Sequence, residues 1–255
     1  MQRSVRAASI LAHPDDAEFL CAGVLAMLAA RGWSVTIVTA TPGDCGSADL
    51  PADEIASIRR REAAAAANLI GADYRCLEER DLAIDYNTAA RRRFTEVVRS
   101  LRPTIIFTHP LIDYMADHEI VGRLVRDACF AAPMPNFRAS GDSAPLDAIP
   151  HLYYCDPFMG GGEAADSTEI VDVSSAMETK RLMLAEHRSQ RDWLRRQHGI
   201  DEYMRLQEEL AKARGALLCV PFAEGFSQHR GHPYPQNDLL SEALAAPLAR
   251  EGGGL

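Results

Sequence analysis

Apolar residues follow two alternating patterns along the first half of the chain. Short runs at residues 7–12, 35–40 and 104–108 are apolar or β-branched, which predicts buried strands. Between these runs, apolar residues return every three or four positions, as at 52–70 and from Ile120 to Cys129, which predicts amphipathic helices. Strands that alternate with helices favour a parallel sheet with crossover helices on its faces.

The fold class follows from this alternation. We predict an α/β fold, a Rossmann-like three-layer sandwich with a mainly parallel sheet, formed by a single domain over residues 1–255. The periodicity weakens at residues 131–150, where four prolines predict a long loop of the kind that often shapes a binding site. Further predicted elements are short strands at residues 151–155 and 169–173 and helices at residues 175–197 and 201–213. A flexible connection is predicted at residues 160–162 and a frayed tail at residues 252–254.

Composition and charge narrow the class of protein. The chain has 255 residues, and its 36 Asp and Glu against 27 Lys and Arg give a net charge of −9. Such a surface repels phosphate backbones, so we expect no nucleic-acid partner. The six cysteines form no C-x-x-C pair, which argues against zinc-finger and thioredoxin motifs and suits reduced thiols. No apolar run reaches the roughly 18 residues of a membrane span, so we expect a cytoplasmic protein without a membrane partner.

A first group of metal-binding residue types directly follows the first predicted strand. It is the sequence His13-Pro14-Asp15-Asp16. Ligands of open α/β sheets bind at the carboxyl ends of strands, which makes this position favourable for chemistry. Aspartate is also a common N-cap, so one of the two carboxylates could simply cap the next helix. Capping accounts for neither the second carboxylate nor the histidine, and we therefore favour metal binding or catalysis.

A second group follows the predicted strand at residues 104–108. It contains His109, Asp113, Asp117 and His118, and it again precedes an amphipathic helix. Because parallel strands end at the same edge of a sheet, the two groups should meet there. Two alternatives remain open within the group. His109 could be a half-buried structural histidine, and Asp113 could cap the helix or form local hydrogen bonds.

The two groups together offer a candidate metal site. His13, Asp16 and His118 supply two imidazoles and one carboxylate, a set that suits Zn²⁺ with an open position for water. The same set fits Fe²⁺ or another divalent ion. Asp15 is then left to take a proton from the water and pass it to a leaving group, since a metal-bound water has its pKa lowered to roughly 7.

These residues resemble the LmbE-like, or PIG-L, family of zinc-dependent N-acetylglucosaminyl deacetylases. The resemblance covers much of the chain, and its most specific part is the pairing of HPDD with the distal Asp117-His118. Further matches are an R-x-x-E…LG helix, a K…H-x-S-Q helix and a late FAEGF segment, which contain Arg59, Glu62, Gly71, Lys180, His187, Ser189, Gln190 and residues 222–226.

The resemblance implies roles for particular residues. It implies that His13, Asp16 and His118 bind the metal, that Asp15 is the general base and that Arg59 faces the substrate. An exposed helix face, with Arg59 paired to Glu62, is the alternative for that arginine. The resemblance also implies a small-molecule substrate, an N-acetylated sugar, and a homo-oligomeric assembly.

One position departs from the family pattern. Members commonly have His-Pro-Asp-His at the distal site, where the first histidine steadies the oxyanion and the aspartate orients it. This chain has Met115-Ala116-Asp117-His118, and a methionine cannot donate a hydrogen bond. Losing one such donor typically costs about 10²–10³ in rate. Tyr114 or His187 could supply the missing donor, although His187 could equally be a histidine on a helix surface.

Two hypotheses for the activity follow. The first is a metal-dependent deacetylase, an amidohydrolase acting on linear C–N amide bonds, which removes an acetyl group from an amino-sugar-like substrate through a metal-activated water. The second is a metal-dependent hydratase or lyase of a small oxo acid on the same fold, which the departure at Met115 keeps open. A non-haem iron oxygenase and a sugar-binding module without activity are less favoured, since the fold pattern opposes the former and the intact ligand set opposes the latter.

Overall fold

The computed structural model describes residues 5–157, 168–198 and 202–245. Within these residues, seven strands form one sheet in the order β3-β2-β1-β4-β5-β7-β6. The strands from β3 to β5 are parallel, whereas β7 runs antiparallel to both of its neighbours. The strands are β1 (Arg6–Leu11), β2 (Ser34–Thr39), β3 (Asp73–Cys76), β4 (Ile105–Thr108), β5 (His151–Cys155), β6 (Glu169–Asp172) and β7 (Ala223–Gln228).

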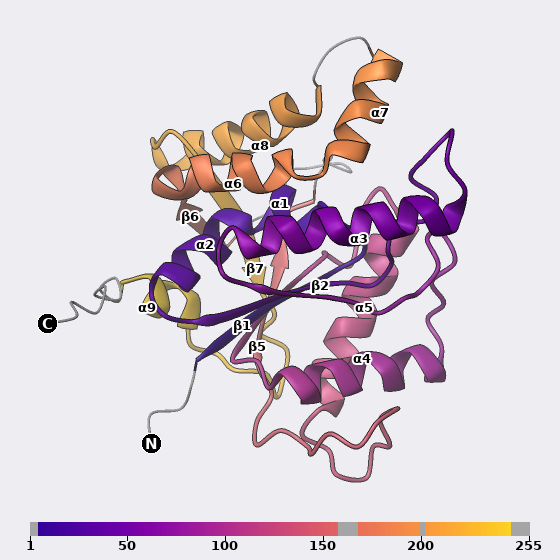
Figure 1. The fold of residues 1–255 in the computed structure, drawn as a ribbon. Coiled ribbons are helices and arrows are strands. Elements are labelled where there is room, and N and C mark those ends of the chain that lie inside the picture. Colours follow the sequence, from indigo (N-terminus) through magenta and orange to yellow (C-terminus); the bar gives the residue numbers. More distant parts are fainter. Residues whose placement is uncertain (1–4, 158–167, 199–201, 246–255) are drawn as a thin grey trace, which may run out of the picture.

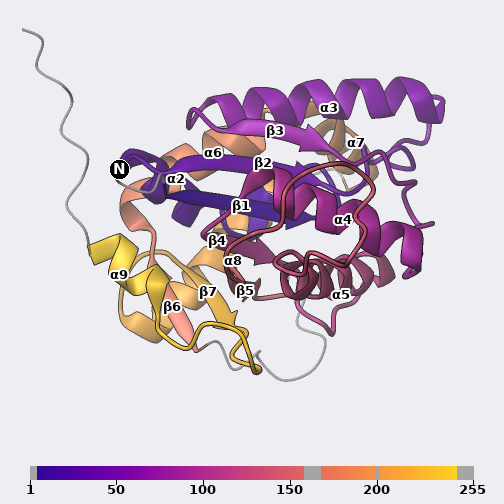
Figure 2. The same cartoon turned by 90° about the horizontal axis from the view of Figure 1, so that it is seen from below.

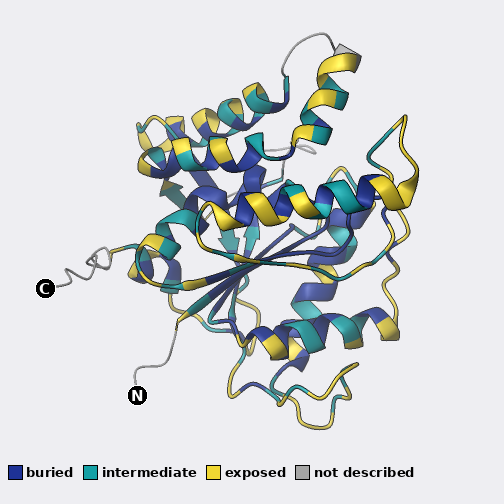
Figure 3. Cartoon of the chain, in the orientation of Figure 1, coloured by how far each residue is buried: buried dark blue, intermediate teal, exposed yellow. Residues whose placement is uncertain are grey.

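Helices cover both faces of this sheet, which gives the predicted three layers (Figures 1 and 2). One hydrophobic core lies between the sheet and the helices α2, α6 and α8, and a second lies between the sheet and α4 and α5. The central strands are therefore buried on both faces, as Figure 3 shows. The helices are α1 (Asp16–Leu20), α2 (Ala22–Ala30), α3 (Ala52–Asn68), α4 (Thr88–Leu101), α5 (Ala116–Ala131), α6 (Met177–Ala185), α7 (Arg188–His198), α8 (Glu202–Leu218) and α9 (Leu239–Ala245), with a 3₁₀ turn at Ser174–Ala176.

The strand order confirms the α/β prediction and locates a crevice. The chain moves outward from β1 to β2 and β3 on one side and from β4 to β5 on the other. The order therefore reverses between β1 and β4, which pair in parallel. Ligands of open α/β sheets bind at such a reversal, outside the carboxyl ends of the strands. Both groups of candidate residues follow these two strands.

The prediction of one helix over residues 175–197 was wrong. The structure breaks it between α6 and α7, where the N–H of His187 donates to the carbonyl of Leu184 in a tightened last turn. Glu62 of α3 stabilises the new helix start, since its carboxylate accepts hydrogen bonds from the backbone and hydroxyl of Ser189 at 2.8 and 2.6 Å. A partner 127 positions away in sequence leaves no local signal of the break.

The apolar positions Phe19, Val24 and Leu28 predict a single helix after the first strand, and the structure divides it as well. It forms α1 and α2, which separate at Cys21. Glu224 of β7 caps the second helix, because its carboxylate accepts hydrogen bonds from the N–H groups of Gly23 and Val24, both at 2.8 Å. The sequence interpretation treated residues 222–226 only as a family motif and missed β7 and α9. The interruption of the β7 pattern by Gly225 hid that strand.

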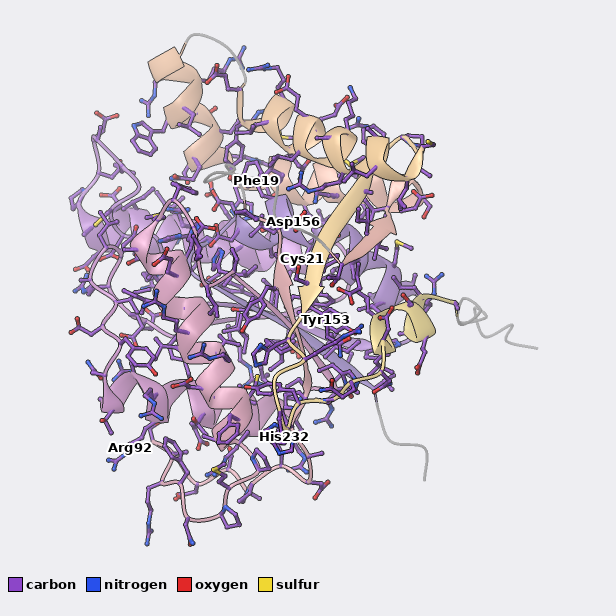
Figure 4. The ribbon with its side chains drawn as sticks, turned by 180° about the vertical axis from the view of Figure 1, so that it is seen from behind. Phe19, Cys21, Arg92, Tyr153, Asp156 and His232 are labelled. Atoms are coloured by element: carbon purple, nitrogen blue, oxygen red, sulfur yellow. The ribbon has the colours of Figure 1, made fainter. Side chains whose placement is uncertain are left out.

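The loop at residues 131–150 is confirmed as a connection between α5 and β5, but its expected place at the binding site is wrong. It packs against α4, where the N–H of Ser140 donates to the carbonyl of Arg92 and the N–H of Ser143 donates to Glu96. Figure 4 labels Arg92 near the molecule's lower edge. The glycine stretches at 160–162 and 252–254 lie outside the described residues. No helix in the described part of the chain is both long and apolar enough to span a membrane.

Candidate metal centre

Two loops at the strand-order reversal carry the candidate ligands. His13 and Asp16 follow β1, and His118 lies in the first turn of α5, after β4. Gly122 lets α5 approach the loop closely, because a Cβ atom at that position would lie 2.6 Å from the carbonyl oxygen of His109. The buried side chain of His118 lies against the loop after β1, where it contacts His13 and Asp16.

Ligand atoms of three residues, with both carboxylate oxygens of Asp16 among them, converge at this point. The Nε2 atom of His118 lies 3.3 Å from Nδ1 of His13 and 3.6 Å from Oδ1 of Asp16. The Nδ1 atom of His13 lies 3.5 Å from Oδ2 of Asp16. Ligand atoms bound tetrahedrally at about 2.05 Å from Zn²⁺ lie about 3.3 Å apart. The three donors therefore fit a divalent ion, as their residue types suggested, and they form one of the groups able to hold such an ion.

The remaining ring nitrogens of both histidines contact carboxylates. His13 Nε2 lies 2.8 Å from Asp81 Oδ1 and 3.3 Å from Asp117 Oδ2, and His118 Nδ1 lies 3.0 Å from Asp113 Oδ1. Donating the ring proton to these carboxylates leaves a lone pair on each of the two converging nitrogens. Histidine ligands of metals are oriented in this way, and two nitrogens that face each other with lone pairs suit a cation between them.

The charges around the centre also favour a cation. Burial lowers the pKa of His13, but the carboxylates of Asp117, Asp16 and Asp81 raise it well above its ordinary value. Burial would raise the pKa of Asp16, yet the imidazoles of His118 and His109 hold it well below its ordinary value. The centre therefore concentrates negative charge where a positive ion would lie.

Asp15 lies beside the centre in an unusual backbone conformation. Its φ of 98° is left-handed and rare for a residue other than glycine, and its side chain makes no helix-capping hydrogen bond. The hydroxyl of Tyr203 donates to Oδ2 at 2.6 Å, and the guanidinium of Arg59 lies 3.5 Å from the same atom. Burial raises the pKa of this carboxyl, and the charge of Arg59 opposes that rise. The capping alternative thus fails for this residue.

Arg59 and His187 are both buried, contrary to their surface alternatives. Arg59 donates to the carbonyls of Pro14 and Gly43 at 2.7 and 3.2 Å and lines the pocket beside Asp15. His187 is 0% exposed, lies 3.4 Å from Glu18 and is not among the pocket-lining residues. The structure therefore does not place His187 where it could contact an oxyanion.

His109 lies behind the ligands. It is fully buried, its Nε2 is 3.0 Å from Asp16 Oδ2, and its ring stacks on that of His118 at 3.9 Å. Burial and the neighbouring His118 lower its pKa to about 4, so this histidine is neutral near pH 7. Its position supports the structural alternative.

A pocket of about 300 Å³ opens above the ligands. Met115 and Tyr114 line it, as the distal motif predicts, and Asp117 contacts His13 and the backbone N–H of Leu82 rather than the side chain at position 115. In the family pattern, the aspartate at position 117 would orient a histidine at position 115. With Met115 in that place, Asp117 instead contacts His13 and the backbone of Leu82. The pocket is lined by His13, Asp15, Asp16, Cys45, Gly46, Arg59, Asp81, Leu82, Tyr114, Met115, His118, Gln190 and Trp193.

Comparisons with known proteins identify the family of the segment that carries this site. The family model described as PIG-L: GlcNAc-PI de-N-acetylase matches residues 8–129, a span that contains every candidate ligand. Residues 8–129 therefore form a PIG-L family domain. The PIG-L fold extends beyond that span, since the structure of N,N'-diacetylchitobiose deacetylase from Pyrococcus horikoshii covers 93% of this chain and 90% of its own, with a TM-score of 0.78 and 25% identity.

Two curated relatives of this PIG-L protein carry different activities. A 1D-myo-inositol 2-acetamido-2-deoxy-alpha-D-glucopyranoside deacetylase from Nakamurella multipartita is 28% identical, over 90% of this chain and 91% of its own. A 4-oxalmesaconate hydratase from Pseudomonas putida is 24% identical, over 51% of this chain and 53% of its own. Both of the activities weighed from the sequence therefore occur among proteins similar to this one.

Sequence reasoning missed two residues of this PIG-L site. Asp81 contacts His13, and Tyr203 contacts Asp15 from α8, 188 positions away. Neither residue lies in a motif with a recognisable spacing. Asp81 follows β3 within a charged stretch that resembles an ordinary exposed loop, and only the fold brings it to the carboxyl ends of β2 and β1.

Proposed function

We propose that this protein is a divalent-metal-dependent deacetylase that hydrolyses the N-acetyl amide of an amino-sugar-like substrate. The observation that carries the proposal is the convergence of His13, Asp16 and His118, whose nearest ligand atoms are 3.3–3.6 Å apart in pairs, with Asp15 lining the same pocket. Deacetylases among the relatives support the reaction class. We propose Zn²⁺ as the ion, because two imidazoles and one carboxylate form a common catalytic zinc set.

The residues divide the chemistry among them. A divalent ion held by His13, Asp16 and His118 would supply a Lewis acid for the amide carbonyl and lower the pKa of water. Asp15 takes the proton of the attacking water as the new C–O bond forms, and it returns that proton to the amine as the C–N bond breaks. The products are acetate and a primary amine. Both contacts of Asp15 with Tyr203 and Arg59 fall on Oδ2, which orients the carboxylate for this transfer.

Acetate release from N-acetylated amino sugars tests the proposal. We expect hydrolysis that a chelator abolishes and that one added divalent metal restores. His13→Ala should lower kcat/KM by at least about 10³ because it removes a ligand. His151→Ala is the matched control. His151 is the first residue of β5, at the amino-terminal ends of the parallel strands and away from the site, where its side chain hydrogen-bonds Asn237. Activity that survives both chelation and His13→Ala would reject the proposal.

A hydratase acting on a small oxo acid is the second candidate. Met115 favours it, because this side chain lines the pocket but cannot donate a hydrogen bond to the oxyanion of amide hydrolysis. The relative from Pseudomonas putida shows that a similar chain can be a hydratase. Metal-dependent hydration of an unsaturated oxo acid, with no acetate released from any N-acetyl sugar, would establish this candidate over the first.

A further inference from the structure

Large apolar side chains lie exposed at the mouth of the metal pocket. Leu82 is 67% exposed and Tyr114 is 55% exposed, and both line the pocket together with Met115. We call these three residues the apolar lip. An exposed leucine alone is ordinary on a protein surface, but several exposed apolar side chains that line one pocket are typical of a binding site.

The backbone holds Leu82 at this place. Its φ of 61° is left-handed, a conformation that is costly for a branched residue such as leucine. Its N–H donates at 2.8 Å to Asp117 Oδ2, the atom that also lies 3.3 Å from His13 Nε2. The lip is thus tied to the metal centre by a hydrogen bond through a single carboxylate.

The lip adjoins the position of the reacting amide. The Tyr114 ring meets the His118 ring edge-on, with centroids 5.3 Å apart. Met115 precedes α5 by one residue, three positions before His118 in the sequence. An amide carbonyl near the ligands would therefore have one of its substituents beside the lip.

Other parts of the pocket are polar and suit a sugar. Arg59 and Asp81 supply charged groups, and Gln190 of α7 donates to the carbonyl of Gly46 at 2.8 Å. The indole Nε1 of Trp193 is buried and has no hydrogen-bond partner in the described part of the chain. Sugar hydroxyls need hydrogen-bond partners of this kind, whereas an acyl chain offers only C–H groups and is stabilised by apolar contact.

We infer that the apolar lip binds the acyl group of the substrate and that the enzyme prefers N-acyl chains longer than acetyl. This inference rests on the proposed deacylation and specifies its substrate class, an amino sugar with a short or medium acyl chain. An acetyl group ends at one methyl and would leave most of the lip in contact with water. Each added methylene that the lip covers should raise kcat/KM by about twofold to fourfold, because full burial of one methylene is worth roughly fourfold.

A chain-length series tests the inference. We would measure kcat/KM for N-acetyl-, N-butanoyl-, N-hexanoyl- and N-octanoyl-glucosamine by the release of the free amine. The expected result is a rise of about tenfold or more from acetyl to hexanoyl. A flat or falling series would overturn the inference and leave the proposed deacetylase intact. Hydrolysis of none of the four compounds would instead reject the proposed function itself.

Variants of the lip supply the second readout. Leu82→Ser should lower the hexanoyl-to-acetyl ratio of kcat/KM by about threefold to tenfold, since it removes apolar contact with the acyl chain and leaves the polar contacts of the sugar in place. Leu217→Ser is the matched control, because Leu217 is 64% exposed on α8 and does not line the pocket. An equal ratio in both variants and the wild type would overturn the assignment of the lip.

Tyr114→Phe separates the ring of this residue from its hydroxyl. The phenylalanine keeps the apolar surface, so the hexanoyl-to-acetyl ratio should stay within about twofold of the wild-type value. If the ratio falls as far as in Leu82→Ser, the apolar ring is not what contacts the chain and the inference is contradicted.

Discussion

At the scale of residues, the site depends on contacts that orient a few reactive atoms. Asp113 orients His118, and Asp81 and Asp117 orient His13, so that one ring nitrogen of each imidazole faces the same point. The HPDD and Asp-His motifs predicted the inner residues, because those residues follow strands. The outer partners Asp81 and Tyr203 could not be predicted, since only the tertiary fold brings them to the motif.

Tyr203 gives a prediction at this scale. Its side chain is buried, and burial together with the carboxylate of Asp15 raises the pKa of its hydroxyl well above the ordinary value, so the hydroxyl stays protonated and donates. Tyr203→Phe should lower kcat by about tenfold, because a hydrogen bond to a charged group is worth ~1.5–3 kcal/mol. KM should stay unchanged, since Tyr203 does not line the pocket.

Steady-state kinetics of two variants measure this effect. Tyr74→Phe is the matched control, because its hydroxyl bonds Thr39 at 2.9 Å away from the pocket. A change in KM with constant kcat in Tyr203→Phe, or an equal loss of kcat in both variants, would show that Tyr203 does not position Asp15.

At the scale of elements, buried acidic groups join segments that are distant in sequence. Glu62 of α3 stabilises the start of α7 through Ser189. Glu224 of β7 caps α2 and also accepts a hydrogen bond from Lys180 of α6 at 2.5 Å. In Figure 4, Phe19 and Asp156 mark this region, where α8 passes over β7. Periodicity predicted most helices and strands, but it missed the breaks at Cys21 and His187, because long-range carboxylates stabilise them.

The Lys180–Glu224 pair gives a prediction of stability. Both side chains are almost fully buried, at 1% and 2% exposure. Glu224→Gln should lower the free energy of unfolding by about 3–5 kcal/mol, because it leaves a buried ammonium without its counter-charge. Urea denaturation measures the loss. The double variant Lys180→Met with Glu224→Gln should recover part of it, and a single-variant loss under about 1 kcal/mol would contradict the role of the pair.

At the scale of the whole molecule, the strand order decides where chemistry can occur. The alternation of apolar runs predicted a mainly parallel sheet, and the sheet reverses its order between β1 and β4, where both histidine groups lie. The net charge of −9 predicts that nucleic acid is not a partner, but it indicated nothing about the reaction. The expected binding role of residues 131–150 failed, because loop composition does not specify which end of the sheet a loop covers.

The metal content of the purified protein tests the central claim most directly. Elemental analysis of the wild type should find about one divalent ion per chain, with zinc the expected ion. His118→Ala should lose that ion while its circular dichroism spectrum stays unchanged, and His151→Ala should retain it. A folded wild-type protein that binds no divalent ion, or a His118→Ala variant that binds it as tightly as the wild type, would contradict the account.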